Sequence, residues 1–138
     1  MDHTALLCLL GFAAWQIVLV CAIAAARALA ILKGEKKSNE FTSGHPHGSD
    51  VYWRLNRAHI NTAENLAVFA VAVFVASAVG VPGEDIATVA KVWLAARIAQ
   101  SLIHISSNSE MAVNLRFASL GVQIACFFAV AWKIWQTA

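Results

Sequence analysis

Four long apolar segments alternate with short polar stretches along the chain. The first runs from Thr4 to Ala26 without a charged residue, which is long enough to cross a hydrocarbon core of roughly 30 Å at about 1.5 Å per residue. It predicts a helix over residues 4–33 that stops at Gly34. The other apolar segments predict helices over residues 50–79, 84–105 and 112–135.

The polar stretches between these segments are typical of connections. GEKKSNEFTSGHPHGSD is rich in glycine, serine and charge, VGVPGED is a tight turn, and SSNSEMAVN forms the third connection. Ser49 or Asp50 can cap the second helix by accepting a hydrogen bond from a free backbone N–H. The pattern predicts an all-α chain, a single four-helix domain over residues 1–138.

Composition places this bundle in a membrane. Hydrophobic residues make up 59% of the chain and charged residues 13%, with a mean hydropathy of +0.65, which is far from the average of soluble proteins. The net charge of +2 is small and the basic residues are dispersed. We therefore expect an integral multi-pass protein surrounded by lipid, with no nucleic-acid partner.

The basic residues near the ends of the spans predict the orientation. Lys33, Lys36 and Lys37 belong to the first loop, and the third loop leads into Arg116, whereas the VPGED turn is acidic. Lysine and arginine are enriched in cytoplasmic loops of membrane proteins. Loops 1 and 3 are therefore predicted to be cytoplasmic, and both termini are predicted to lie on the opposite side.

Polar side chains recur at helical spacing on this predicted cytoplasmic side. Steps of three, four and three residues place one set on a single face of the second helix: Arg54, Arg57, Asn61 and Glu64. A second stripe on the third helix consists of Arg97, Gln100, Ser101 and His104. Lys33 closes the first helix and Arg116 opens the fourth at the same depth. We expect these stripes to face other helices or a wet cavity.

The charge balance of the stripes predicts an anionic ligand. An arginine at the centre of a membrane helix costs about 2.5 kcal/mol or more, so each needs a partner. Glu64 is the only carboxylate in the stripes. Because the planar guanidinium forms two parallel hydrogen bonds with a carboxylate, the surplus arginines favour a carboxylate ligand.

Structural roles compete with ligand binding for each of these residues. Arg54 could lie at the interface and extend its charged end to water, and Arg97 could pair with Glu64. Residues of the second and third helices could equally form a network that joins helices. The two histidines of the HPH sequence, His45 and His47, are better explained by a solvated loop than by a metal site, and no metal is predicted.

The helix 2 pattern R-x-x-R-A-H-x-N-x-x-E resembles the signature of the MAPEG superfamily, membrane-associated proteins in eicosanoid and glutathione metabolism. Arg54, Arg57, Asn61 and Glu64 carry it, with His59 as its histidine. The resemblance covers essentially the whole chain, and Arg97, Arg116 and Lys33 also fall at positions that family members use.

The resemblance implies a homotrimer with glutathione bound between neighbouring subunits, and an apolar small-molecule electrophile that arrives from the bilayer. In that reading the ligand is held by Lys33, Arg54, Arg57, Asn61, Glu64, Arg97 and Gln100. Arg116 stabilises the glutathione thiolate, with His104 as a second catalytic residue, because the thiolate is the reactive nucleophile.

Three positions depart from the family pattern and leave alternatives open. Several members have tyrosine in place of His104, histidine in place of Gln100, and serine or threonine in place of Phe117. The leading hypothesis is a glutathione-dependent transferase or peroxidase, and the first alternative is a non-catalytic relative that binds glutathione or another anion. A small four-helix transporter is disfavoured, because the first helix lacks a buried acidic residue.

Overall fold

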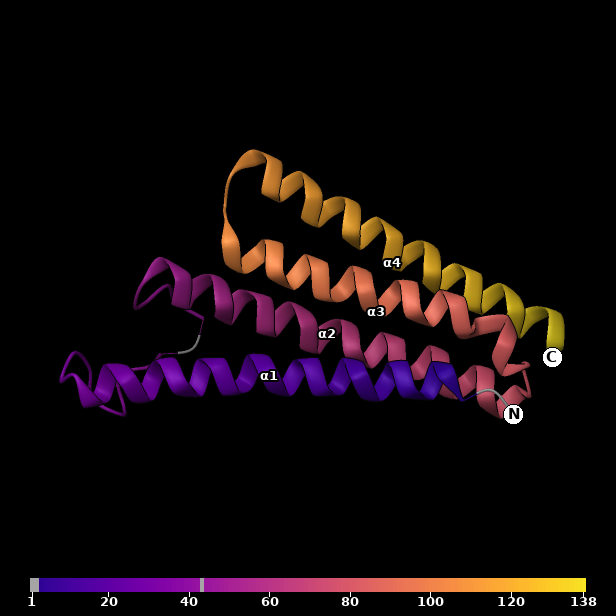
Figure 1. Ribbon diagram of the computed structural model, residues 1–138, viewed down its shortest axis with the longest axis horizontal. Coiled ribbons are helices and arrows are strands. Elements are labelled where there is room, and N and C mark those ends of the chain that lie inside the picture. Colours follow the sequence, from indigo (N-terminus) through magenta and orange to yellow (C-terminus); the bar gives the residue numbers. More distant parts are fainter. Residues whose placement is uncertain (1–2, 43) are drawn as a thin grey trace.

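The chain forms four helices that lie lengthwise beside one another. The computed structural model describes residues 3–42 and 44–138, and the helices of this part are α1 (Thr4–Leu32), α2 (Asp50–Val79), α3 (Gly83–Ser106) and α4 (Glu110–Thr137). Both ends of the chain lie at one end of the bundle, and the α1–α2 and α3–α4 connections lie at the other (Figure 1). The predicted all-helical fold class is confirmed.

Each helix is long and apolar enough to cross a membrane. Large hydrophobic side chains cover much of the outer surface, among them Leu7, Leu10, Phe74 and Trp135. A water-soluble chain rarely exposes so much contiguous apolar surface, whereas a bilayer solvates it. The protein is an integral multi-pass membrane protein.

Glycine residues end the first two helices by the same local geometry. Gly34 has a φ of +71°, and its N–H donates to the carbonyl of Ile31 while the N–H of Glu35 donates to Ala30. Gly80 has a φ of +86°. Its N–H donates to the carbonyl of Ser77, and the N–H of Val81 donates to the carbonyl of Ala76. Glycine adopts this left-handed conformation without a steric cost, which explains why both helices stop there.

Serine hydroxyls begin two of the helices. Ser49 accepts a hydrogen bond from the N–H of Tyr52 at 3.2 Å, so α2 starts at the predicted residue. Ser109 accepts from Ala112 at 3.2 Å, and α4 therefore begins at Glu110, two residues before the apolar run that the sequence prediction used. In both cases the side chain satisfies a backbone donor that the first turn leaves free.

The bundle interior divides into an apolar half and a polar half. Toward the chain ends, tilted rings from three helices pack against one another: the centroids of Phe12 and Phe69 are 5.6 Å apart, and those of Phe69 and Trp93 are 4.7 Å apart. The buried polar side chains lie toward the α1–α2 and α3–α4 connections: Thr62, Arg97, Gln100, Ser101 and Gln123. Helix α3 contacts the other three helices, whereas α1 and α4 share no contact among the described residues.

Candidate functional site

Arg97 is the deepest charged group in the polar half. Its side chain is only 1% exposed, and its Nη1 donates to Asn61 Oδ1 at 2.7 Å and to the Asn61 carbonyl at 3.3 Å. Its Nε and Nη2 atoms are buried without a hydrogen-bond partner, and its Cζ lies 6.0 Å from the centre of the Phe12 ring. The guanidinium therefore ties α3 to α2 and keeps unused donor capacity.

Three further polar contacts join the helices around Arg97. The hydroxyls of Thr62 and Ser101 lie 3.0 Å apart between α2 and α3. Gln123 Nε2 donates to Gln100 Oε1 at 2.9 Å, and Gln100 Nε2 donates to the carbonyl of Arg116 at 3.0 Å. The side-chain amide of Gln100 is thus engaged at both ends by α4.

A cavity of about 170 Å³ opens between α2, α3 and α4 beside this network. Its polar lining consists of the buried Gln100 and the half-buried Asn61, His104 and Arg116, and apolar side chains complete it: Val113, Phe117 and Leu120. None of the described residues that line the cavity is acidic. The cavity is therefore cationic and suits an anionic group.

Arg57 and Glu64 flank Asn61 on the same face of α2. Each lies one helical turn from Asn61, and both side chains are exposed on the surface of the single chain. The structure records no ion pair between Arg97 and Glu64 and gives Arg97 the side chain of Asn61 as its hydrogen-bond partner instead. In the described part of the chain, the recorded ion pair joins Lys133 to Asp85 near the opposite end.

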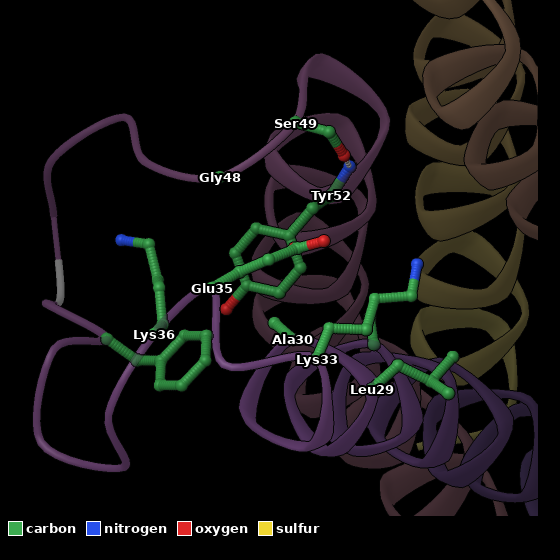
Figure 2. A pocket seen from close by; sticks show the side chains of 10 residues that line it. Leu29, Ala30, Lys33, Glu35, Lys36, Gly48, Ser49 and Tyr52 are labelled. Carbon is green, nitrogen blue, oxygen red and sulfur yellow. Dashed lines mark hydrogen bonds between the residues drawn. The ribbon is translucent and has the colours of Figure 1, made fainter.

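Two residues of the predicted site lie apart from the cavity. Arg54 donates from Nε to the carbonyl of Ile105 at 2.8 Å, which connects the start of α2 to the last turn of α3. Lys33 lines a separate pocket at the end of α1 (Figure 2), and α1 does not contact α4 in the described chain. Within one chain, the structure therefore brings together Asn61, Arg97, Gln100, His104 and Arg116.

Gln123, whose amide completes the α3–α4 contact, was not predicted as a site residue. Gln123 follows Arg116 by seven residues, so the two lie on one face of α4, and this spacing was the available signal. Asn65 was not predicted either, and its Oδ1 accepts from Trp93 Nε1 at 3.0 Å. Among the described residues, no group of three or more His, Cys, Asp or Glu side chains could hold a metal ion.

Comparison with known proteins identifies the family. The model of the MAPEG family matches residues 5–135. The comparisons with curated proteins and with solved structures give no significant match.

Proposed function

The chain belongs to the MAPEG family, and from this premise we propose that it binds glutathione at the cationic cavity and joins the glutathione sulfur to an apolar electrophile, or uses glutathione to reduce a peroxide. The observation that carries the proposal is the cavity itself, which places Arg116 and His104 beside Asn61 with no acid in its lining. A carboxylate ligand would supply the negative charge that this arrangement lacks.

The residues around the cavity match the groups of glutathione. The ligand has two carboxylates, an amine and a thiol. Arg57 and Arg116 are suited to the carboxylates, Glu64 to the amine, and Asn61 to a neutral amide of the ligand. Arg97 supports this arrangement from behind, because its bond to the Asn61 side chain fixes the orientation of that amide.

The site is completed by a neighbouring chain in this proposal. A cavity of about 170 Å³ is smaller than the roughly 300–1,000 Å³ of typical ligand sites. Glu64 lies near the middle of the 30-residue α2 and is exposed, a position at which a lone chain would present a carboxylate to lipid. A homotrimer covers that face.

Arg116 is the group that we propose to favour the thiolate over the thiol. Its positive charge stabilises the sulfur anion, which is the nucleophile. The sulfur then forms a bond to an electrophilic carbon. When the electrophile is an activated alkene, the sulfur adds to one alkene carbon and the other carbon accepts a proton, which balances the proton lost by the thiol. His104, beside Arg116 in the cavity lining, is positioned to hydrogen-bond the sulfur or the electrophile.

Isothermal titration of glutathione into detergent-purified protein tests the proposal. Wild type is compared with Arg57→Ala and Glu64→Ala, and Lys133→Ala is the matched control because it removes a charge near the other end of the bundle. We expect saturable binding in wild type and in the control, and its loss in the two site variants. Absence of binding at millimolar glutathione in wild type would contradict the proposal.

A non-catalytic glutathione-binding protein is the second candidate. The favouring observation is Gln100, whose amide oxygen accepts from Gln123 and whose amide nitrogen donates to the Arg116 carbonyl, so that it joins α3 to α4 and keeps a single N–H for a ligand. Turnover with a generic aromatic electrophile separates the two candidates. Catalysis that is abolished in Arg116→Ala supports the enzyme, whereas binding without turnover supports the second candidate.

A further inference from the structure

A second cavity lies at the end of α1, about 210 Å³ in volume. Its walls are the last turns of α1, residues of the loop that follows and the first turn of α2. Figure 2 shows Tyr52 at the centre of this pocket, with Lys33 and Lys36 on either side. This cavity is separate from the one lined by Arg116 and His104.

Three cations surround the second cavity, and one carboxylate, that of Glu35, lines it. Lys33 and Lys36 belong to the lining. Arg27 lies behind it and contacts two lining residues, Tyr52 and Phe41. Arg27 Nε donates to the Tyr52 hydroxyl at 2.8 Å, and its Cζ lies 5.2 Å from the centre of the Phe41 ring. The surroundings therefore carry a surplus of positive charge, which favours an anionic ligand.

The Arg27 side chain is held in place, although most of its N–H donors have no recorded hydrogen bond. The phenol and the aromatic ring hold its guanidinium, and Lys36 Nζ lies 5.8 Å from the centre of the same Phe41 ring. A guanidinium has five N–H donors, and the structure records one hydrogen bond for Arg27. Arg27 does not line the cavity itself, and it adds positive charge behind the wall that Phe41 and Tyr52 form.

The cavity changes from apolar to polar along the axis of α1. Ala26, Leu29 and Ala30 form the part within the helix, and the part beyond its end adds Lys36 and Ser49 beside the rings of Phe41 and Tyr52. Arg27 lies six residues before Lys33, about 9 Å along the helix axis. On the adjacent surface, Leu29 and Leu32 are 56% and 83% exposed. This gradient matches a phospholipid, whose phosphate lies just above its acyl chains.

We propose that this cavity binds the phosphate of an anionic phospholipid headgroup. Its volume is below that of typical sites for drug-sized ligands, about 300 Å³ or more, and suits a small charged group. A lipid accounts for the apolar lining and the exposed leucines as well as the cations, whereas a free phosphate ion accounts only for the cations. Basic pockets at the cytoplasmic ends of membrane helices bind anionic headgroups in this way.

Native mass spectrometry of the detergent-purified protein tests this assignment. Phosphatidylglycerol and phosphatidylcholine with identical acyl chains are added to wild type, Arg27→Gln, Lys36→Gln and Lys37→Gln. Lys37→Gln is the matched control, because it removes the same charge from the same loop but does not line the cavity. Lys36→Gln tests the site with little change to the fold, since the contacts that it removes are a 3.5 Å bond to the Glu40 carbonyl and the approach of Nζ to the Phe41 ring at 5.8 Å.

We expect wild type and Lys37→Gln to prefer phosphatidylglycerol, and the association constant for it to fall about fivefold in each of the other two variants. Equal binding of the two lipids by wild type would overturn the proposal. So would an equal loss in Lys37→Gln, which would indicate attraction to the whole basic loop. Full displacement of the lipid by millimolar inorganic phosphate would assign the cavity to a soluble anion instead.

Discussion

At the scale of single residues, the buried contact between Arg97 and Asn61 is the most sensitive point of the polar interior. Asn61→Ala removes the acceptor 2.7 Å from Nη1 and leaves a third guanidinium nitrogen without a side-chain partner in a 1% exposed group. We expect a loss of about 1–2 kcal/mol in the free energy of unfolding, measured by thermal denaturation in detergent.

Two companion variants identify the cause of that loss. Asn61→Asp restores an acceptor of similar size and should keep most of the stability. The double variant Asn61→Ala/Arg97→Leu removes both partners and should be more stable than Asn61→Ala alone, because no buried charge is left unpaired. If the double variant were the less stable of the two, the contact would not be the source of the effect.

The same contact explains which part of the site the sequence could predict. Helical spacing placed Asn61 and Glu64 on one face of α2, and Arg97 and Gln100 on one face of α3. Spacing within a helix says nothing of how deep a neighbouring helix sits or how it is rotated. Arg97 therefore could not be assigned to Asn61 rather than to Glu64, and the bond between Gln123 and Gln100 could not be predicted.

At the scale of helices, the turn between α2 and α3 depends on the conformation of one glycine. Gly80 has a φ of +86°, and a Cβ built there would meet nothing within 4 Å, so the cost of Gly80→Ala comes from the backbone alone. We expect a loss of about 1 kcal/mol, measured by thermal unfolding in detergent.

Gly121→Ala is the matched control for this turn. Gly121 lies within α4, has no positive φ, and a Cβ there would also meet no atom within 4 Å. Alanine is favoured over glycine inside a helix, so this variant should be as stable as wild type or slightly more stable. Equal destabilisation by both substitutions would indicate that the backbone conformation of Gly80 is not what matters.

Helix positions followed from the sequence more closely than helix ends did. The predicted range 50–79 coincides with α2 because Ser49 and Gly80 both act through local bonds that a sequence pattern reveals. The fourth helix extends two residues beyond the predicted range at each end, since Ser109 caps it before the apolar run begins and its last turn continues through Thr137. Hydropathy locates the membrane-embedded part of a helix, whereas capping fixes where it starts.

At the scale of the whole molecule, the exposed charges on α2 predict association. Arg57 and Glu64 face outward from the single chain at the depth of the cavity, where lipid could not solvate them. We expect native mass spectrometry in mild detergent to give the mass of three 14.8 kDa chains. Glu64→Leu should keep the chain folded while abolishing glutathione binding. A wild-type species of one chain would contradict both the trimer and the shared site.

The orientation of the bundle predicts which connections a charged reagent can reach. Lys33, Lys36 and Lys37 follow α1, whereas the α2–α3 turn leads into Glu84 and Asp85, so the positive-inside rule assigns the first connection to the cytoplasm. Ser38→Cys and Glu84→Cys place one new thiol on each side. A membrane-impermeant maleimide applied to intact cells should label Glu84→Cys and spare Ser38→Cys until the cells are permeabilised. Wild type controls for the native thiols, because Cys8 and Cys126 are buried and Cys21 lies within the membrane span of α1.

The reverse pattern would place the α1–α2 connection and its basic cavity outside the cytoplasm, where anionic lipid is scarcer, and would weaken the electrostatic reason for a headgroup site there.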